Sequence, residues 1–104
     1  MPDTVPALTE KQFQSQVVEL AAALDYSIYH PFYSQRSTPG WPDLTLVRPP
    51  RVLFVELKTA KGKLTLYQGI WADELKQCPG VEYYLWRPDD WPEIGRILQG
   101  DTDG

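Results

Sequence analysis

The sequence predicts an α/β domain in which helices flank a mixed sheet and the elements follow the order α-β-β-β-α-β-α. Apolar residues recur at helical spacing between residues 10 and 25, and a capping box opens another helix at Thr65. The most hydrophobic segment, residues 52–58, follows a short proline-rich turn, which is typical of a hairpin. A helix between that strand and the next indicates a parallel, right-handed crossover.

The first elements are a helix, a strand and a loop. Thr9 and Gln12 fit a capping box, and the apolar stripe after them predicts a helix over roughly residues 10–25. Aromatic residues and isoleucine predict a strand over residues 26–33. Serine, threonine, glycine and proline then predict a loop over residues 34–42.

The central hairpin consists of a strand at residues 43–47 and a strand at residues 52–58. Residues 48–51, Arg-Pro-Pro-Arg, are expected to form the turn, because proline removes the N–H donors that a central strand needs.

The last three elements are a helix, a strand and a helix. Thr65 and Gln68 fit a second capping box, which starts a helix of about three turns. Valine and aromatic residues predict a strand over residues 81–87, and Asp89 or Asp90 is expected to cap the final helix.

Length and composition predict one domain, residues 9–99, between a flexible leader (1–8) and a disordered tail (100–104). One cysteine, Cys78, excludes an internal disulfide and favours a reducing, cytoplasmic environment; we expect its side chain to be buried. No apolar run is long enough to cross a membrane, and the start of the chain lacks the features of a signal peptide.

The charge is unevenly distributed. The net charge is −4, yet residues 36–63 contain six basic residues against two acidic ones, a local charge of +4. A basic centre in an acidic chain can bind a polyanion with one face. Equally, these side chains can decorate the edge of a hairpin, and charge alone does not separate the two interpretations.

Glu56 and Lys58 interrupt the most hydrophobic strand. Side chains alternate along a strand, so these two share one face while Leu53, Val55 and Leu57 share the other. Burying a carboxylate and an ammonium is costly, which indicates either an ion pair or a functional site.

Asp43 begins the partner strand, and in a hairpin its side chain approaches Glu56. Two carboxylates held together repel and favour a divalent cation such as Mg²⁺. Lys58 beside them can stabilise developing negative charge. These residue types together are suited to hydrolysing a phosphodiester.

The same residues resemble the PD-(D/E)xK nuclease superfamily, whose members have a restriction-endonuclease-like core. A fuller set, spread over about residues 9–98, is similar to the VRR-NUC (virus-type replication-repair nuclease) family. The matching segments are Arg-Ser-Thr-Pro-Gly-Trp-Pro-Asp-Leu at 36–44, Val-Glu-Leu-Lys at 55–58, Gly-Lys-Leu-Thr at 62–65, Gln68, and Val-Glu-Tyr-Tyr-Leu-Trp-Arg-Pro at 81–88.

The resemblance implies a stand-alone, bacterial or phage-encoded endonuclease that uses Mg²⁺ or Mn²⁺ to cut branched or structured DNA, such as a Holliday junction or a flap, in DNA repair or recombination. It also implies a homodimer. Asp43, Glu56 and Lys58 are then catalytic residues, with Asp43 and Glu56 as metal ligands.

The resemblance also implies a further acid on the first helix. Glu10 lies at the margin of the apolar stripe and Glu19 on the opposite face, so Glu10 is the better metal ligand. An acid in the first turn also favours the helix dipole, which is an equally physical role for Glu10.

Gln68 shares a helix face with apolar residues, and the resemblance places it beside the metal as a catalytic residue; alternatively it only closes the capping box with Thr65. Arg36, Ser37, Lys61 and Lys63 are candidate DNA contacts, although ordinary surface side chains look the same in a sequence.

Two other functions remain open. The chain can be a non-catalytic module that binds nucleic acid or recruits another protein, or an α/β protein in which Glu56 and Lys58 form an internal ion pair. A buried ion pair adds little net stability, so the last possibility explains these residues poorly.

Overall fold

The computed structural model describes residues 7–31 and 38–100. The expected order α-β-β-β-α-β-α is confirmed, with a short 3₁₀ turn added before the last helix. The elements are α1 (Glu10–Ala23), β1 (Ser27–Tyr29), β2 (Leu44–Arg48), β3 (Arg51–Leu57), α2 (Leu66–Lys76), β4 (Glu82–Trp86), η1 (Pro88–Asp90) and α3 (Trp91–Gln99).

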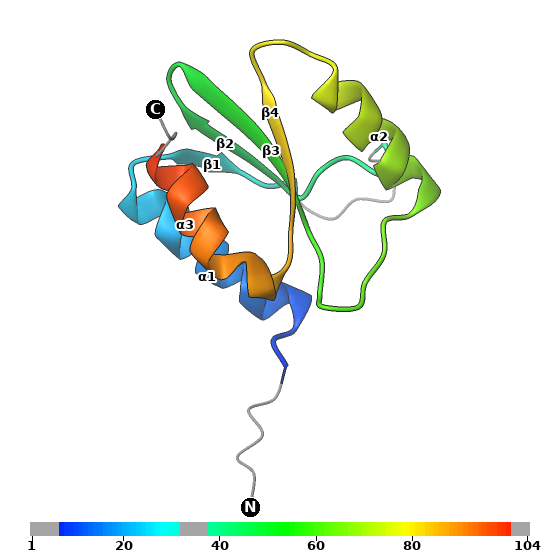
Figure 1. The fold of residues 1–104 in the computed structure, drawn as a ribbon, viewed down its shortest axis with the longest axis horizontal. Coiled ribbons are helices and arrows are strands. Elements are labelled where there is room, and N and C mark those ends of the chain that lie inside the picture. The colour runs from blue at the N-terminus through cyan, green and yellow to red at the C-terminus, as the bar shows by residue number, and fades with distance from the viewer. Residues whose placement is uncertain (1–6, 32–37, 101–104) are drawn as a thin grey trace, which may run out of the picture.

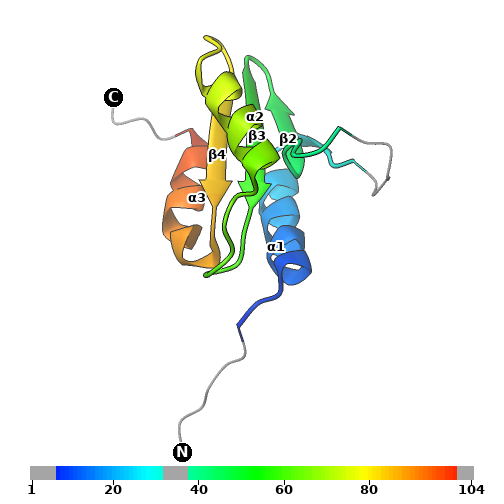
Figure 2. The ribbon, with the colours of Figure 1, turned by 90° about the vertical axis from the view of Figure 1, so that its right-hand side faces the viewer.

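The four strands form one mixed sheet in the order β1-β2-β3-β4. The pairs β1–β2 and β2–β3 are antiparallel, whereas β3 and β4 run parallel, as the expected crossover requires. Helices α1 and α3 lie on one face of the sheet and α2 on the other, so the domain has three layers (Figures 1 and 2).

The core lies between the sheet and the α1–α3 layer. The alternating residues Leu53, Val55 and Leu57 of β3 have no exposed surface, which confirms the face predicted for them. Burying each of these side chains contributes about 2 kcal/mol relative to leaving it exposed. The rest of the buried cluster is Phe13, Val17, Ala21, Tyr26, Leu44, Leu46, Trp86, Ile94 and Leu98.

Both predicted capping boxes are present. The backbone N–H of Gln12 donates to the Thr9 hydroxyl at 3.0 Å, and the Gln12 side chain accepts from the Thr9 N–H at 2.9 Å. Thr65 and Gln68 repeat this exchange at the start of α2, at 3.2 and 2.9 Å. Each box satisfies amides that have no partner within the helix.

Three expectations about local structure are wrong in detail. Arg48 and Arg51 form the last paired rung of the hairpin, so only Pro49 and Pro50 make the turn. The first strand covers Ser27–Tyr29 only: Tyr26 lies before it, with its hydroxyl donating to the carbonyl of Leu98 at 2.8 Å, and residues 32 and 33 of the expected strand lie outside the described residues.

Cys78, expected in the core, is exposed. It follows the last residue of α2 at a turn where no other element covers it, and its thiol donates to the carbonyl of Glu74.

In the part of the chain that the structure describes, no helix is long and apolar enough to cross a bilayer. Most of the predicted leader and tail, residues 1–6 and 101–104, lies outside the described residues.

Candidate active site

Asp43 lies in a bend immediately before β2, opposite Glu56 in the β2–β3 register. Because β2 begins at Leu44, the backbone N–H of Leu57 has no partner on that strand. The Asp43 carboxylate takes this role, and its Oδ2 accepts from the Leu57 N–H at 2.8 Å. The position of the Asp43 side chain is therefore fixed by the backbone of the strand that carries Glu56.

The glycine loop before Asp43 is joined to helix α2 by a close backbone contact. Gly40 has φ +86°, and a Cβ atom there would lie 2.5 Å from the carbonyl carbon of Tyr67. Glycine is therefore required both for the backbone conformation and for the approach. The Trp71 indole N–H donates to the carbonyl of Pro39 at 3.1 Å and holds the loop a second time.

Glu56 is the one charged residue among the buried side chains of the described chain, with 1% of its surface exposed. Its Oε2 accepts from the Gln68 side-chain amide at 2.9 Å and lies 3.9 Å from Nζ of Lys58. The Lys58 ammonium is thus near the carboxylate without a hydrogen bond to it, which leaves its three donors available to another group.

Burial raises the pKa of the Glu56 carboxyl to about 8, and the charge of Asp43 and a hydrogen bond with it act in the same direction. Lys58 opposes this increase and Glu10 adds to it. The pKa of the Tyr83 phenol rises to about 12, first through burial and then through the charges of Glu56 and Asp43. The surroundings of Glu56 therefore disfavour its ionised form, because Lys58 only partly offsets burial and the charge of Asp43.

The structure distinguishes the two acids of α1. Both Glu10 and Glu19 are exposed, but only Glu10 acts on the Glu56 pKa. The described residues contain no group of three or more Asp, Glu, His or Cys side chains placed to hold one metal ion. Asp43 and Glu56 thus form a pair, and Glu10 influences it without completing a cluster.

Gln68 closes the predicted capping box and also contacts Glu56. Its side-chain oxygen accepts from the Thr65 N–H, and its amide nitrogen donates to Glu56. The capping box fixes the oxygen of the side-chain amide, so the nitrogen of the same amide reaches the buried carboxylate in a set orientation. Helix α2 is in this way attached to the acidic pair.

The lysine-bearing loop after β3 is held by Arg87, a residue that we did not single out from the sequence. The Arg87 Nη1 donates to the carbonyls of Thr59 at 2.7 Å and Gly62 at 2.6 Å. Lys61 and Lys63 project from this loop and are exposed. The other two candidate DNA contacts, Arg36 and Ser37, lie outside the described residues.

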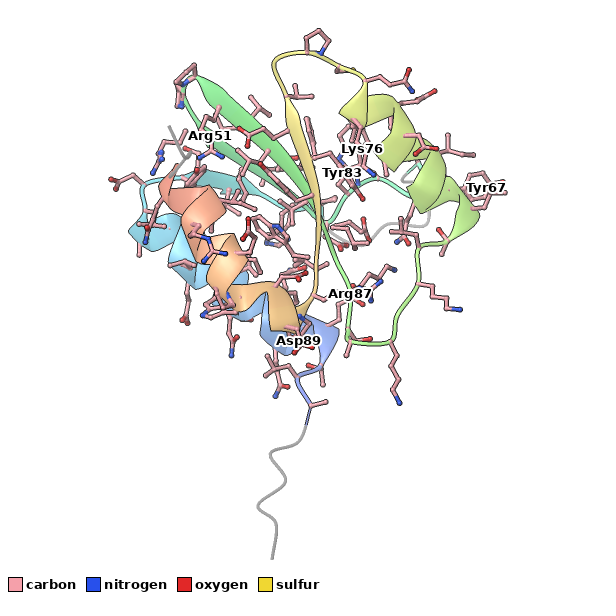
Figure 3. The ribbon with its side chains drawn as sticks, viewed as in Figure 1. Arg51, Tyr67, Lys76, Tyr83, Arg87 and Asp89 are labelled. Atoms are coloured by element: carbon pink, nitrogen blue, oxygen red, sulfur yellow. The ribbon has the colours of Figure 1, made fainter. Side chains whose placement is uncertain are left out.

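Arg48 and Arg51, two of the six basic residues between positions 36 and 63, lie outside the candidate site. Arg48 donates to the carbonyl of Leu24 at 2.9 Å, and Arg51 forms two hydrogen bonds with Glu82, at 2.7 and 2.8 Å. Arg48 pairs with Arg51 at the hairpin end of the sheet, and Figure 3 shows Arg51 well away from Arg87. These two arginines therefore belong to the edge of the hairpin, the second of the two interpretations of the basic residues at positions 36–63.

Arg87 and Tyr83 were missed because their positions depend on the parallel pairing of β3 with β4. The register pairs Tyr83 with Phe54, two residues before Glu56, and Leu57 with Trp86, next to Arg87. The sequence did predict that strands at residues 52–58 and 81–87 run parallel. Without the register, however, that prediction does not say which residues of the second strand lie near Glu56.

Three comparisons with known proteins, against family models, curated proteins and solved structures, found no match.

Proposed function

We propose that this chain is a divalent-metal-dependent endonuclease that hydrolyses phosphodiester bonds in structured or branched DNA. The observation that carries the proposal is the pairing of buried Glu56 with Asp43, beside a lysine whose ammonium has no hydrogen-bond partner among the described residues. A carboxyl group whose pKa is shifted by burial and by a specific charged neighbour is typical of catalytic sites.

The acidic pair suits a magnesium ion. Burial and the neighbouring carboxylate disfavour ionised Glu56, and a bound divalent cation would make the two negative charges compatible. Mg²⁺ sites often take only one or two carboxylates and keep several waters, which agrees with a pair of acids. When bound, the ion would supply electrophilic stabilisation of a phosphate and a more acidic water.

The chain's own groups have separate roles in this proposal. Asp43 and Glu56 bind the ion, the Asp43 side chain being fixed by the Leu57 amide. Gln68 donates to Glu56 and keeps that carboxylate in place. Lys58 donates to the phosphate oxygen on which negative charge grows, as water attacks phosphorus and the bond to the leaving oxygen breaks.

The proposal includes membership of the VRR-NUC family within the PD-(D/E)xK superfamily. The motif residues quoted from the sequence support this membership. Lys61 and Lys63 are proposed DNA contacts, since both are exposed on the loop that follows Lys58. A cytoplasmic homodimer also stays a prediction, which sedimentation of the full chain and cell fractionation test.

The deciding experiment is cleavage of labelled junction, flap and duplex DNA with Mg²⁺, Mn²⁺ or EDTA. Asp43→Asn and Lys58→Ala are expected to lower cleavage by at least a hundredfold, because the first removes a charged metal ligand and the second removes the cation that stabilises the reacting phosphate. Asp73→Asn is the matched control, since Asp73 is an exposed aspartate of α2, and it should cut as the parent does.

Two outcomes contradict the proposal. If Asp43→Asn cuts as well as the parent, the acidic pair is not the active site. If the parent binds DNA in a salt-dependent way and cuts none of the substrates with either metal, the chain is a nucleic-acid-binding or recruitment module instead. Comparing Glu10→Gln with Glu19→Gln separates a metal-assisting acid from a solvated one.

A further inference from the structure

A hollow lined by aromatic side chains lies on the α2 face of the sheet, beside the acidic pair. Its volume is about 310 Å³, and its lining is Tyr29, Pro31, Thr38, Trp41 and Trp71. That volume is at the small end of the range for ligand pockets, which suits one flat heterocycle. None of these five lining side chains carries a charge.

The strand register places the hollow next to the site. Tyr29 pairs with Thr45, which pairs with Phe54, and the next rung on that face contains Asp43 and Glu56. Trp41 packs edge-on over Phe54, with ring centroids 5.6 Å apart. The α-carbons of Trp41 and Asp43 are at most about 7 Å apart, because only Pro42 lies between them.

The two indoles form a preset corner. Their ring centroids are 4.7 Å apart and their planes meet at 86°, and the Trp71 indole N–H is held by the carbonyl of Pro39. A flat aromatic guest that stacks on one indole therefore points its edge at the face of the other, an arrangement that aromatic quadrupoles favour. Tyr29 is 61% exposed, so its ring is available to a guest.

We propose that this hollow binds one unpaired nucleobase of the DNA strand, next to the phosphate that the acidic pair cleaves. This inference rests on the proposed nuclease function. A nucleobase is the flat, uncharged group that is always attached to a phosphodiester backbone, so a hollow beside a phosphate site complements it when its described lining is uncharged and mainly aromatic.

A base stacked inside a duplex is covered on both faces and cannot enter such a corner. The substrate class is therefore DNA with an unpaired base at the cut, such as a bulge or a branch point, in preference to intact duplex. Every base has a π face, so stacking is expected to be tolerant of base identity.

The test measures binding and cleavage on two DNAs. One is a labelled duplex with a single unpaired base, and the other carries an abasic residue at the same position. Binding is followed by fluorescence anisotropy in EDTA, so that no strand is cut. The variants are Tyr29→Ala and, as the matched control, Tyr67→Ala, because Tyr67 is 57% exposed and points outward from α2 (Figure 3).

The parent is expected to bind the abasic DNA about tenfold more weakly, which is the usual effect of losing one stacked base. Tyr29→Ala is expected to lose about tenfold on the unpaired-base DNA and little on the abasic one, whereas Tyr67→Ala should match the parent on both. Equal binding of the two DNAs by the parent, or no effect of Tyr29→Ala, overturns the proposal.

Cleavage of the same DNAs with Mg²⁺ keeps the two proposals apart. Cleavage that Glu56→Gln abolishes, with equal binding of both DNAs, overturns the base pocket alone. Binding that depends on the base and on Tyr29, without cleavage, supports the pocket and overturns the nuclease. No binding of either DNA overturns both.

Discussion

Strand β3 carries charged side chains at both ends, and the structure treats the two ends differently. At the hairpin end, Arg51 forms a two-point ion pair with Glu82 and donates to the Tyr26 hydroxyl and the Ile97 carbonyl. At the other end, Glu56 faces Asp43, and the nearest cation, Lys58, stays 3.9 Å away.

The pKa shifts at the two ends have opposite signs. The hydrogen bond from Arg51 lowers the pKa of Glu82 below its usual range. Burial and Asp43 raise the pKa of Glu56 to about 8. The ionised form of Glu82 is therefore stabilised by its surroundings, whereas the surroundings of Glu56 disfavour its ionised form. The first arrangement supports the fold, and the second is the kind that a ligand completes.

The largest expected difference comes from neutralising one carboxylate at each end. Glu56→Gln should lower cleavage about a thousandfold, because it removes a metal ligand worth several kcal/mol of transition-state stabilisation. It should leave the free energy of unfolding at pH 8 in EDTA unchanged or higher, since the amide carries no charge to bury.

Glu82→Gln should do the reverse. It weakens a partly exposed pair and leaves Arg51 without its counter-ion, so we expect a loss of about 2 kcal/mol in urea denaturation with cleavage within twofold of the parent. If both variants change stability and cleavage alike, the two ends do not differ in role.

The acidic end also depends on a backbone contact that the hairpin end lacks. Gly40→Ala should destabilise the protein by about 3 kcal/mol, because a Cβ atom at φ +86° would meet the backbone of Tyr67. The variant should also cut more slowly, since the contact joins the Asp43 loop to α2.

Gly69→Ala is the matched control, because its added Cβ has no atom within 4 Å and lies in a helix. Alanine there should raise the free energy of unfolding by about 1 kcal/mol. Thermal denaturation of both variants measures the two effects. A Gly40→Ala protein as stable as the parent would show that the loop moves freely away from α2.

The two ends predict opposite pH dependence in the metal-free protein. Between about pH 5 and 8, native Glu56 keeps a proton that the unfolded chain has lost, so the free energy of unfolding falls as the pH rises. Glu82 has a lowered pKa, so its stabilising contribution is present above its unfolded value and is lost as the pH falls through the native one.

Urea denaturation in EDTA from pH 4 to pH 8 measures both slopes. Glu56→Gln should remove the decline above pH 5, and Glu82→Gln should reduce the loss at acid pH. Mg²⁺ should stabilise the parent more at pH 8 than at pH 6, because ion and proton compete for the same carboxylates. Parallel curves for the parent and Glu56→Gln would contradict the raised pKa.

The sequence predicted the features that depend on residues close together in the chain. Alternation along residues 52–58 placed Leu53 and Val55 in the core and Glu56 opposite them, and the two capping boxes fixed the starts of α1 and α2. The meeting of Asp43 with Glu56 was also predictable, because a hairpin with a two-proline turn leaves few registers.

The sequence did not predict contacts between distant segments. Arg51 has partners on β4, before β1 and on α3, so its closed network appears only once all three are packed together. Arg87 was missed for the same reason. The low exposure of Glu56 depends on how far α2 covers the sheet, and no local pattern reports that distance.

The smallest expected effect concerns Gln68, whose two bonds separate stability from catalysis at the acidic end. Gln68→Glu keeps an acceptor for the Thr65 N–H but replaces the donor to Glu56 with a third carboxylate. We expect cleavage to fall about tenfold, or about 1.4 kcal/mol, with the helix start retained.

Thr65→Ala is the complementary change. It should cost about 1 kcal/mol of stability by removing the cap, while the Gln68 amide still donates to Glu56 and cleavage stays within twofold. Urea denaturation and single-turnover cleavage of both proteins measure the pair. If Thr65→Ala slows cleavage as much as Gln68→Glu, the capping box itself positions the carboxylate, and the two functions of Gln68 cannot be separated.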